Sequence, residues 1–260
     1  MPARAHKPRQ RLFAKIVVMP VSVKDNVVLV VGASSGMGRE TAVLFAREGA
    51  KVMASARRED RLRDLQRQLA DEGYEIAIHA ADASDPGAME QLAQMTEDAF
   101  GRIDTLVYAT GTNTPDRTLA RLTPEIWNRL LSVNLNGAFY ATHAVLPRMR
   151  TQKAGSIFYI SSVSALTPDV SGAAYQASKR GLTGLAGAIR IEEKDNGIRT
   201  CLVCPGLADT EILNNRPVKP PAEILAKALQ AEDIAELIVD IAKLPPRAWV
   251  PEVHLMPAWV

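Results

Sequence analysis

Short apolar runs alternate with longer helical stretches from Val27 to the end of the chain, and turn residues separate them. The first run, Val27–Val31, consists of valine and leucine only, which is typical of a strand buried on both faces of a sheet. This alternation predicts a parallel sheet covered by helices on both faces. Right-handed crossovers then place ligands beyond the carboxyl ends of the strands. We therefore expect an α/β fold of the Rossmann type, a doubly wound sheet of about seven strands.

Turn residues and apolar periodicity divide the chain into expected elements. We predict strands at residues 27–31, 51–55, 75–79, 103–109, 156–161, 198–203 and 252–256. We predict helices at residues 39–48, 59–71, 85–100, 123–149, 173–194 and 233–243, with a loop and a short helix at 207–230. No internal repeat or interdomain linker interrupts the series, so residues 25–260 should form one domain.

Positive charge is concentrated at the amino end. Residues 1–24 carry six lysines and arginines and no acid, whereas the whole chain has a net charge of +2, so the remainder is net negative. Nucleic-acid binding by the domain is therefore not expected. We predict that residues 1–24 form a flexible extension; a targeting peptide, or an upstream start with Met19 as the alternative, are the other interpretations.

Two further features bear on the cell compartment. No run of 18 apolar residues occurs, so no transmembrane helix is expected. The two cysteines, Cys201 and Cys204, are too few for a disulfide scaffold, which favours the cytoplasm. Their spacing also occurs in metal and redox motifs, but the sequence near them has no second pair of ligands. We predict a buried structural pair and no metal.

A glycine-rich turn follows the first expected strand and opens the first expected helix. Gly32 can form the tight turn, Gly36 admits a phosphate close to the backbone, and Gly38 allows close helix packing. The amides of the helix amino terminus favour a pyrophosphate. The predicted dinucleotide contacts here include the intervening Ser34, Ser35 and Met37.

A second constellation carries reactive groups. Tyr175 and Lys179 lie four residues apart, on one face of an expected helix. A nearby ammonium favours a phenolate, so Lys179 is expected to lower the pKa of Tyr175 toward neutrality. Ser162 ends the expected fifth strand, and its hydroxyl can hold a substrate oxygen against the tyrosine. Asn134 lies inside a helix, where asparagine is a mediocre helix former.

The spacing of these motifs resembles the short-chain dehydrogenase/reductase family, of the single-domain type. The resemblance implies that Asn134, Ser162, Tyr175 and Lys179 are catalytic, with Asn134 in a water relay and Lys179 also binding the ribose. It implies further cofactor contacts at Asp82 and Ala83 near the adenine, at Ala109 and Gly111, and at Pro205, Gly206, Ala208 and Thr210 near the nicotinamide.

Two positions depart from the family pattern. Val31 replaces a threonine, and Tyr108-Ala109-Thr110-Gly111 stands where the family usually has Asn-Asn-Ala-Gly. Ala109 cannot supply the asparagine side chain that braces the cofactor and the sheet. We expect these changes to affect the cofactor affinity and the local stability most.

Cofactor choice depends on the end of the second strand, where family members that use NAD carry an aspartate. Ala56 occupies that position here, and Arg57 and Arg58 follow. Arg57 can stack on the adenine and offer a planar fork to a 2′-phosphate, with Arg58 adding charge or facing water. NADP(H) is thus expected rather than NAD(H), unless both arginines merely begin a charged surface helix.

These features predict an NADP-dependent oxidoreductase that acts on a small-molecule carbonyl compound or secondary alcohol (EC 1.1.1.-). The alternative is a non-catalytic nucleotide-binding sensor or structural relative on the same fold. Residues 112–122 and 207–230 should shape the substrate pocket. By resemblance to the family, a homodimer or homotetramer is expected, with neither a nucleic-acid nor a membrane partner.

Overall fold

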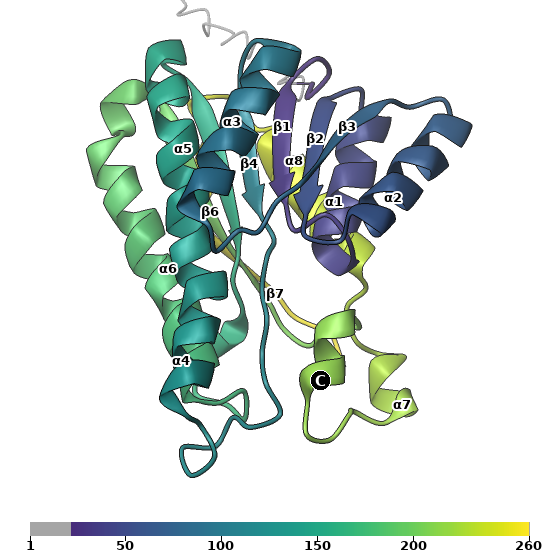
Figure 1. Cartoon of the computed structure of the whole chain (residues 1–260), viewed down its shortest axis with the longest axis vertical. Coiled ribbons are helices and arrows are strands. Elements are labelled where there is room, and N and C mark those ends of the chain that lie inside the picture. The colour runs from purple at the N-terminus through teal and green to yellow at the C-terminus, as the bar shows by residue number, and fades with distance from the viewer. Residues whose placement is uncertain (1–21, 260) are drawn as a thin grey trace, which may run out of the picture.

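The computed structural model describes residues 22–259, in which seven strands form one parallel sheet (Figure 1). The strand order is β3-β2-β1-β4-β5-β6-β7, so the chain starts in the middle of the sheet and winds outward in both directions. The strands are β1 (Val27–Val31), β2 (Lys51–Ala56), β3 (Ile76–Ala80), β4 (Thr105–Tyr108), β5 (Gly155–Ile160), β6 (Ile198–Pro205) and β7 (Glu252–Leu255). This is the predicted doubly wound sheet, with its crossover between β1 and β4.

Eight α-helices and several shorter helical turns connect the strands of the described chain. The α-helices are α1 (Gly36–Arg47), α2 (Glu59–Asp71), α3 (Pro86–Phe100), α4 (Pro124–Leu131), α5 (Gly137–Gln152), α6 (Ala173–Glu192), α7 (Ala222–Leu225) and α8 (Ala231–Ala242). The turns are the π-helical η1 (Ser132–Asn136) and the 3₁₀ turns η2 (Val163–Ala165), η3 (Lys194–Asn196) and η4 (Glu211–Asn215). No helix within residues 22–259 has both the length and the apolar character needed to cross a membrane.

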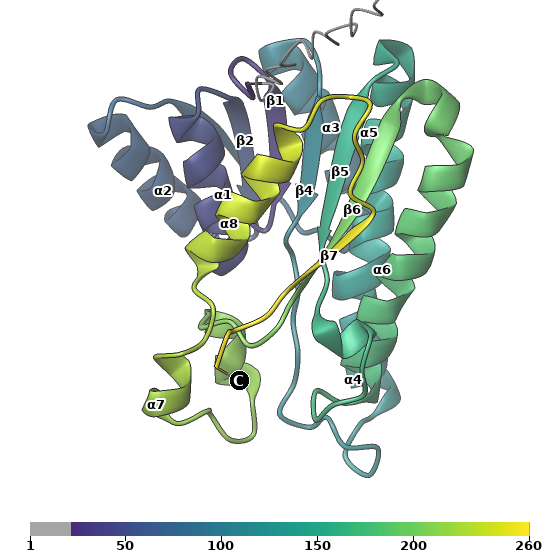
Figure 2. The ribbon, with the colours of Figure 1, turned by 180° about the vertical axis from the view of Figure 1, so that it is seen from behind.

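The sheet separates two hydrophobic cores. Alternate residues of a strand point to opposite faces, so Val28 and Val30 enter the core under α1 and α8, whereas Leu29 and Val31 enter the core under α3, α5 and α6. Figures 1 and 2 show these two helical layers from the front and from behind. Because both faces of β1 are covered, all five of its residues are buried, as its unbroken apolar sequence predicts.

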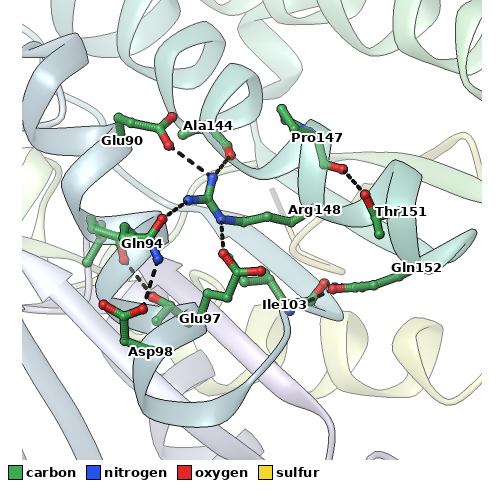
Figure 3. Close-up of polar contacts among 12 residues, drawn as sticks. Glu90, Gln94, Glu97, Asp98, Ile103, Ala144, Pro147, Arg148, Thr151 and Gln152 are labelled. Atoms are coloured by element: carbon green, nitrogen blue, oxygen red, sulfur yellow. Dashed lines mark hydrogen bonds and ion pairs between the residues drawn. The ribbon is translucent and has the colours of Figure 1, made fainter.

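Arg148 of α5 ties this helix to α3 through a cluster of polar contacts (Figure 3). Its guanidinium donates to Glu97 at 2.9 Å, to Glu90 at 3.0 Å and to Gln94 at 2.8 Å, and also to the Ala144 carbonyl at 2.7 Å. The Arg148 side chain is only 11% exposed, so its charge is largely removed from water and is satisfied by these partners. The cluster fixes the outer surface of the layer from which the site is built.

Several boundaries differ from the sequence-based ones by a few residues, and two differences affect the organisation of the chain. The predicted helix at residues 123–149 is divided by η1 into α4 and α5. Val23, which we assigned to the amino-terminal extension, is 1% exposed and belongs to the core, so the fold begins before residue 25. The expectations for residues 1–21 lie outside the described residues. Cys201 and Cys204 are buried with free thiols, as predicted, and they face the two different cores.

Candidate active site

A cleft of about 710 Å³ opens at the carboxyl ends of the strands. It is bordered by the loops after β1, β4, β5 and β6, at the end of the sheet where a doubly wound fold binds its ligands. Every predicted site residue except Asn134 lines this cleft: Gly32, Ser34, Ser35, Gly36, Met37, Gly38, Arg57, Arg58, Asp82, Ala83, Ala109, Gly111, Ser162, Tyr175, Lys179, Pro205, Gly206, Ala208 and Thr210. Asn134 lies fully buried.

The glycine turn brings the amino end of α1 to the floor of the cleft. Gly32 has a φ of +103°, and a Cβ there would lie 2.7 Å from the backbone nitrogen of Thr110. A Cβ on Gly38 would lie 2.4 Å from the Gly32 carbonyl oxygen and 2.8 Å from the Ala109 Cβ. The turn can therefore pack this tightly against the β4 loop only because these positions carry no side chain. The amino terminus of α1 therefore faces the cleft.

Arg58 lies against the same turn. Its guanidinium donates to the Ser34 hydroxyl at 2.9 Å and to the Ser35 hydroxyl at 2.7 Å, and pairs with Glu211 of η4 at 3.0 Å. Arg58 therefore does not simply face water, which was one of its expected positions. Arg57 is exposed at the cleft rim, and its charge acts on Asp82. The end of β2 thus places two arginines at the cleft, with Arg58 nearer the glycine turn.

Tyr108 accounts for the altered motif after β4. Its side chain is fully buried, and its hydroxyl donates to the Val133 carbonyl of η1 at 2.5 Å. A Cβ on Gly137 would lie 2.2 Å from this hydroxyl oxygen, so Gly137 makes room for the tyrosine. Tyr108 braces β4 against the helical layer, while Ala109 allows the close approach of Gly38. The altered motif replaces an asparagine brace with a tyrosine brace.

Asn134 lies in the π-helical turn η1, where the regular hydrogen-bond ladder between α4 and α5 is interrupted. Its side-chain amide clamps the loop after β4, since Oδ1 accepts from the Thr112 amide at 2.8 Å and Nδ2 donates to the Thr112 carbonyl at 3.0 Å. Nδ2 also donates to Ser178 of α6 at 3.0 Å. A Cβ on Gly111 would lie 3.3 Å from Lys179 Nζ and 3.9 Å from Asn134 Oδ1, so both groups border the same glycine.

Tyr175 and Lys179 project from the first turns of α6 beside Ser162, which follows β5. Burial raises the pKa of Tyr175 to about 12, and the Ser162 hydroxyl and the charges of Arg216 and Arg117 oppose this rise. Burial also lowers the pKa of Lys179 to about 8. In this structure the desolvation of the phenol outweighs its favourable neighbours. The expected lowering of this pKa by Lys179 stays a prediction.

Lys179 Nζ lies 5.8 Å from the centroid of the Tyr175 ring and donates to the Ile160 carbonyl at 2.7 Å. Lys179 therefore lines the cleft near the phenol. This places a buried ammonium where it can reach a ligand that crosses the cleft from the glycine turn to Tyr175. The structure brings together three of the predicted reactive groups in the cleft and the fourth directly behind it.

The residues that line the cleft fit a nicotinamide dinucleotide. The turn at Gly32, Gly36 and Gly38 borders the cleft and is packed so tightly that a Cβ at Gly32 or Gly38 would collide with the β4 loop or with the turn itself. Beside this turn, Thr210 Oγ1 is buried and has no hydrogen-bond partner within residues 22–259. A buried hydroxyl without a partner is costly, so a polar ligand group at this point would remove a penalty. A Cβ on Gly36 would lie 3.4 Å from the Thr210 Cβ, so the turn and the unpartnered hydroxyl are neighbours in one cleft.

β7 adds a group of possible metal ligands that the sequence analysis did not foresee. Ligand atoms of Cys204, Glu252 and His254 lie within 4.8 Å of one another. Burial raises the pKa of the Cys204 thiol to about 11, which keeps it protonated and a poor metal ligand. His254 is paired with Glu252 at 2.6 Å. That the chain holds no metal stays a prediction.

The sequence analysis missed four polar residues of the site. Arg117, Asp169 and Arg216 line the cleft beside Tyr175, and Tyr108 is the buried brace described above. Each lies in a loop or a motif without a fixed spacing, so no periodic pattern marks it. A weak signal was available for Arg117 and Arg216, because they fall within the predicted pocket segments 112–122 and 207–230.

Comparison with known proteins supports the fold and the site. The sequence pattern described as short chain dehydrogenase matches residues 26–220. A 3-oxoacyl-(acyl-carrier-protein) reductase from Synechocystis sp. is 33% identical over 228 residues, which cover 86% of this chain and 92% of that protein. Sulfoacetaldehyde reductase 2 from Chromohalobacter salexigens is 32% identical over 246 residues, which cover 90% and 96%.

A solved structure shares the whole architecture. A metagenomic short-chain oxidoreductase in complex with NADP superposes with a TM-score of 0.79 at 30% identity, over 92% of this chain and 100% of that one. The matched family pattern spans the glycine turn, the η1 asparagine, the serine after β5 and the tyrosine and lysine of α6. With this sheet order and this cleft, the chain belongs to the short-chain dehydrogenase family of oxidoreductases that use a nicotinamide cofactor.

Proposed function

We propose that this protein is an NADP(H)-dependent reductase of small carbonyl compounds, which also runs in reverse on the secondary alcohol. The observation that carries the proposal is the convergence of Tyr175, Ser162 and Lys179 in one cleft with the glycine turn. The names of two relatives, reductases of a 3-oxoacyl group and of sulfoacetaldehyde, support carbonyl reduction as the reaction class. Nothing in the cleft favours the non-catalytic sensor, because the proton-transfer residues are intact.

The protein's own contribution is proton transfer and orientation. When bound, the nicotinamide supplies or accepts the hydride. Tyr175 keeps its phenolic proton at neutral pH, since burial raises its pKa to about 12, and can therefore donate that proton to the carbonyl oxygen. Ser162 holds the same oxygen in place with its hydroxyl. Asn134 holds the loop at Thr112 and, with Lys179, borders the backbone at Gly111, where a relay could return the proton.

The pH dependence of reduction should report Lys179. Because burial lowers the pKa of Lys179 to about 8, its ammonium is present below that pH and is lost as the pH rises through it. The Tyr175 proton is retained over this range, so initial-rate kcat/KM for reduction should be flat below pH ~8 and fall above it. A profile that stays flat to the tyrosine range would contradict the role of the ammonium.

Cofactor preference provides the test of the NADP(H) assignment. Arg57 and Arg58 border the cleft at the end of β2 and Ala56 offers no carboxylate, so NADPH should be preferred over NADH by at least about tenfold in kcat/KM, or ~1.4 kcal/mol. The solved relative in complex with NADP supports this choice. The Ala56→Asp, Arg57→Ala double variant should shrink or reverse the preference. Equal use of both cofactors by the wild type would overturn the assignment but not the hydride transfer.

A homo-oligomer built on α5 and α6 remains a proposal. Two large apolar side chains on these helices, Phe139 and Ile191, are 49% and 66% exposed. Such exposure supports an interface between copies of the chain. The cytoplasmic location likewise stays a prediction.

A further inference from the structure

Arg117 is a buried charge at the substrate end of the cleft. The residue is 7% exposed and lies in the loop between β4 and α4. Nε donates to the Thr114 carbonyl at 2.9 Å and Nη2 donates to the Asn215 carbonyl at 2.7 Å. These are its only side-chain hydrogen bonds within residues 22–259, so three of the five N–H donors of its guanidinium remain available there. It forms no ion pair in that range.

Arg216 adds a second positive charge at the same end. It follows η4, lines the cleft and has neither a side-chain hydrogen bond nor an ion pair in the described part of the chain. The two residues are neighbours, because Arg117 Nη2 donates to the carbonyl of Asn215, the residue before Arg216. Burial, and then the charge of Arg216, lowers the pKa of Arg117. Two arginines held together at a partly enclosed site repel each other unless an anion lies between them.

The nearest carboxylate does not fill this role. Asp169 lines the same end of the cleft, but its oxygens already accept from the Ser164 hydroxyl at 2.6 Å, the Ser171 amide at 2.8 Å and the Ser171 hydroxyl at 3.2 Å. It forms no ion pair with either arginine among the described residues. One negative charge, already held by serines, leaves the pair Arg117 and Arg216 with an excess of positive charge.

The position of the pair relative to the reacting group defines what it could bind. A Cβ on Gly172, which caps α6 three residues before Tyr175, would lie 2.6 Å from the Arg117 Cβ, so Arg117 lies beside the start of the helix that carries the phenol. The charges of Arg117 and Arg216 both act on that phenol. The serines of the glycine turn are instead bound by Arg58. The pair therefore faces the substrate rather than the phosphates of a dinucleotide.

We propose that the substrate is a short carbonyl compound that also bears a carboxylate or sulfonate group, and that Arg117 and Arg216 bind this acidic group while the carbonyl faces Tyr175. The inference rests on the proposed reductase function and adds the substrate class to it. A guanidinium matches a carboxylate with two parallel hydrogen bonds. Arg117 is held in place by its two backbone contacts, whereas Arg216 can adjust to the length of the substrate.

The substrate comparison uses succinic semialdehyde, its methyl ester, and sulfoacetaldehyde, with NADPH as the reductant. Succinic semialdehyde should exceed its neutral ester by at least about tenfold in kcat/KM, since a charged hydrogen bond that is lost changes binding by roughly that factor or more. The kcat/KM for sulfoacetaldehyde, compared with that for succinic semialdehyde, shows whether the pair prefers a sulfonate or a carboxylate. Equal rates with the acid and the ester would overturn the inference and leave the reductase function in place. If the protein oxidised NADPH with none of the three compounds, both the inference and the proposed reductase function would be overturned.

Matched variants connect the preference to the two arginines. Arg216→Met should lower the acid-to-ester ratio of kcat/KM by about tenfold, mainly through KM for the acid. Lys219→Met is the control, since Lys219 is an exposed cation three residues away that does not line the cleft, and it should leave the ratio unchanged. Arg117→Met should also lower the ratio. Because Arg117 contacts two loops, the unfolding temperature of the Arg117→Met variant is measured in parallel. The acid-to-ester ratio of kcat/KM is then read only from folded protein.

An unchanged ratio in folded Arg216→Met and Arg117→Met would show that the pair serves only to hold the loops together. Arg117→Lys offers a further distinction. It keeps the charge but loses the planar fork, so the acid should remain preferred over the ester at reduced affinity. A purely structural role for Arg117 would instead change the unfolding temperature and affect both substrates equally.

Discussion

Tyr175→Phe should reduce the rate of carbonyl reduction by about 10²–10⁴-fold while leaving cofactor binding measurable. The substitution keeps the partly buried ring in the cleft and removes only the group that carries the proton. Steady-state turnover gives the rate, and titration of NADP⁺ against intrinsic fluorescence gives the affinity. A retained rate above about a tenth of the wild type would exclude Tyr175 as the acid.

Tyr140→Phe is the matched control for this variant. Tyr140 lies on α5, away from the cleft, so removing its hydroxyl should leave turnover unchanged. If both variants lost activity alike, the effect would have to come from a general change in packing. Comparing the two variants separates the effect of losing the Tyr175 proton from the effect of losing any tyrosine hydroxyl.

Gly38→Ala should nearly abolish cofactor binding and lower the free energy of unfolding by at least about 2 kcal/mol. The new Cβ would lie 2.4 Å from the Gly32 carbonyl oxygen, and that contact is backbone, which cannot turn aside. The start of α1 must then move away from the turn that forms the floor of the cleft. Denaturant unfolding and NADP⁺ titration measure the two effects.

Gly184→Ala, at another helical glycine, should change the free energy of unfolding in the opposite direction. Gly184 lies in the middle of α6, and a Cβ there would meet nothing within 4 Å. Alanine in an exposed helix interior should raise the free energy of unfolding by roughly 0.5–1 kcal/mol, with cofactor binding unchanged. Equal behaviour of the two variants would mean that the tight approach at Gly38 has no part in the fold or the site.

The fold was largely predictable because it depends on repeated local patterns. The apolar run Val27–Val31 and the glycine turn after it lie where the structure has β1 and the start of α1. Helical periodicity alone does not predict the interruption at η1, because a π-helical turn depends on tertiary contacts: Asn134 clamps Thr112, and Gly137 makes room for Tyr108. Thr112 and Tyr108 both lie far from η1 in the sequence.

The candidate site divides in the same way. Residues that belong to motifs of fixed spacing, such as Tyr175 and Lys179, lie in the cleft where the motifs place them. The contacts of Arg58 and Arg117 were not predictable, since each depends on how a loop folds back over the sheet. The desolvation that raises the pKa of Tyr175 was not predictable for a related reason: burial is a property of the whole fold and not of a local spacing.

The most direct test of the reductase function follows the hydride itself. The protein is supplied with succinic semialdehyde and NADPH deuterated at the transferring carbon of its nicotinamide, and the alcohol product is examined by mass spectrometry. Our account predicts that deuterium appears on the carbinol carbon of the product with the wild type and is nearly lost with Tyr175→Phe. Cofactor oxidation without deuterium in the product, or equal transfer by the two proteins, would contradict it.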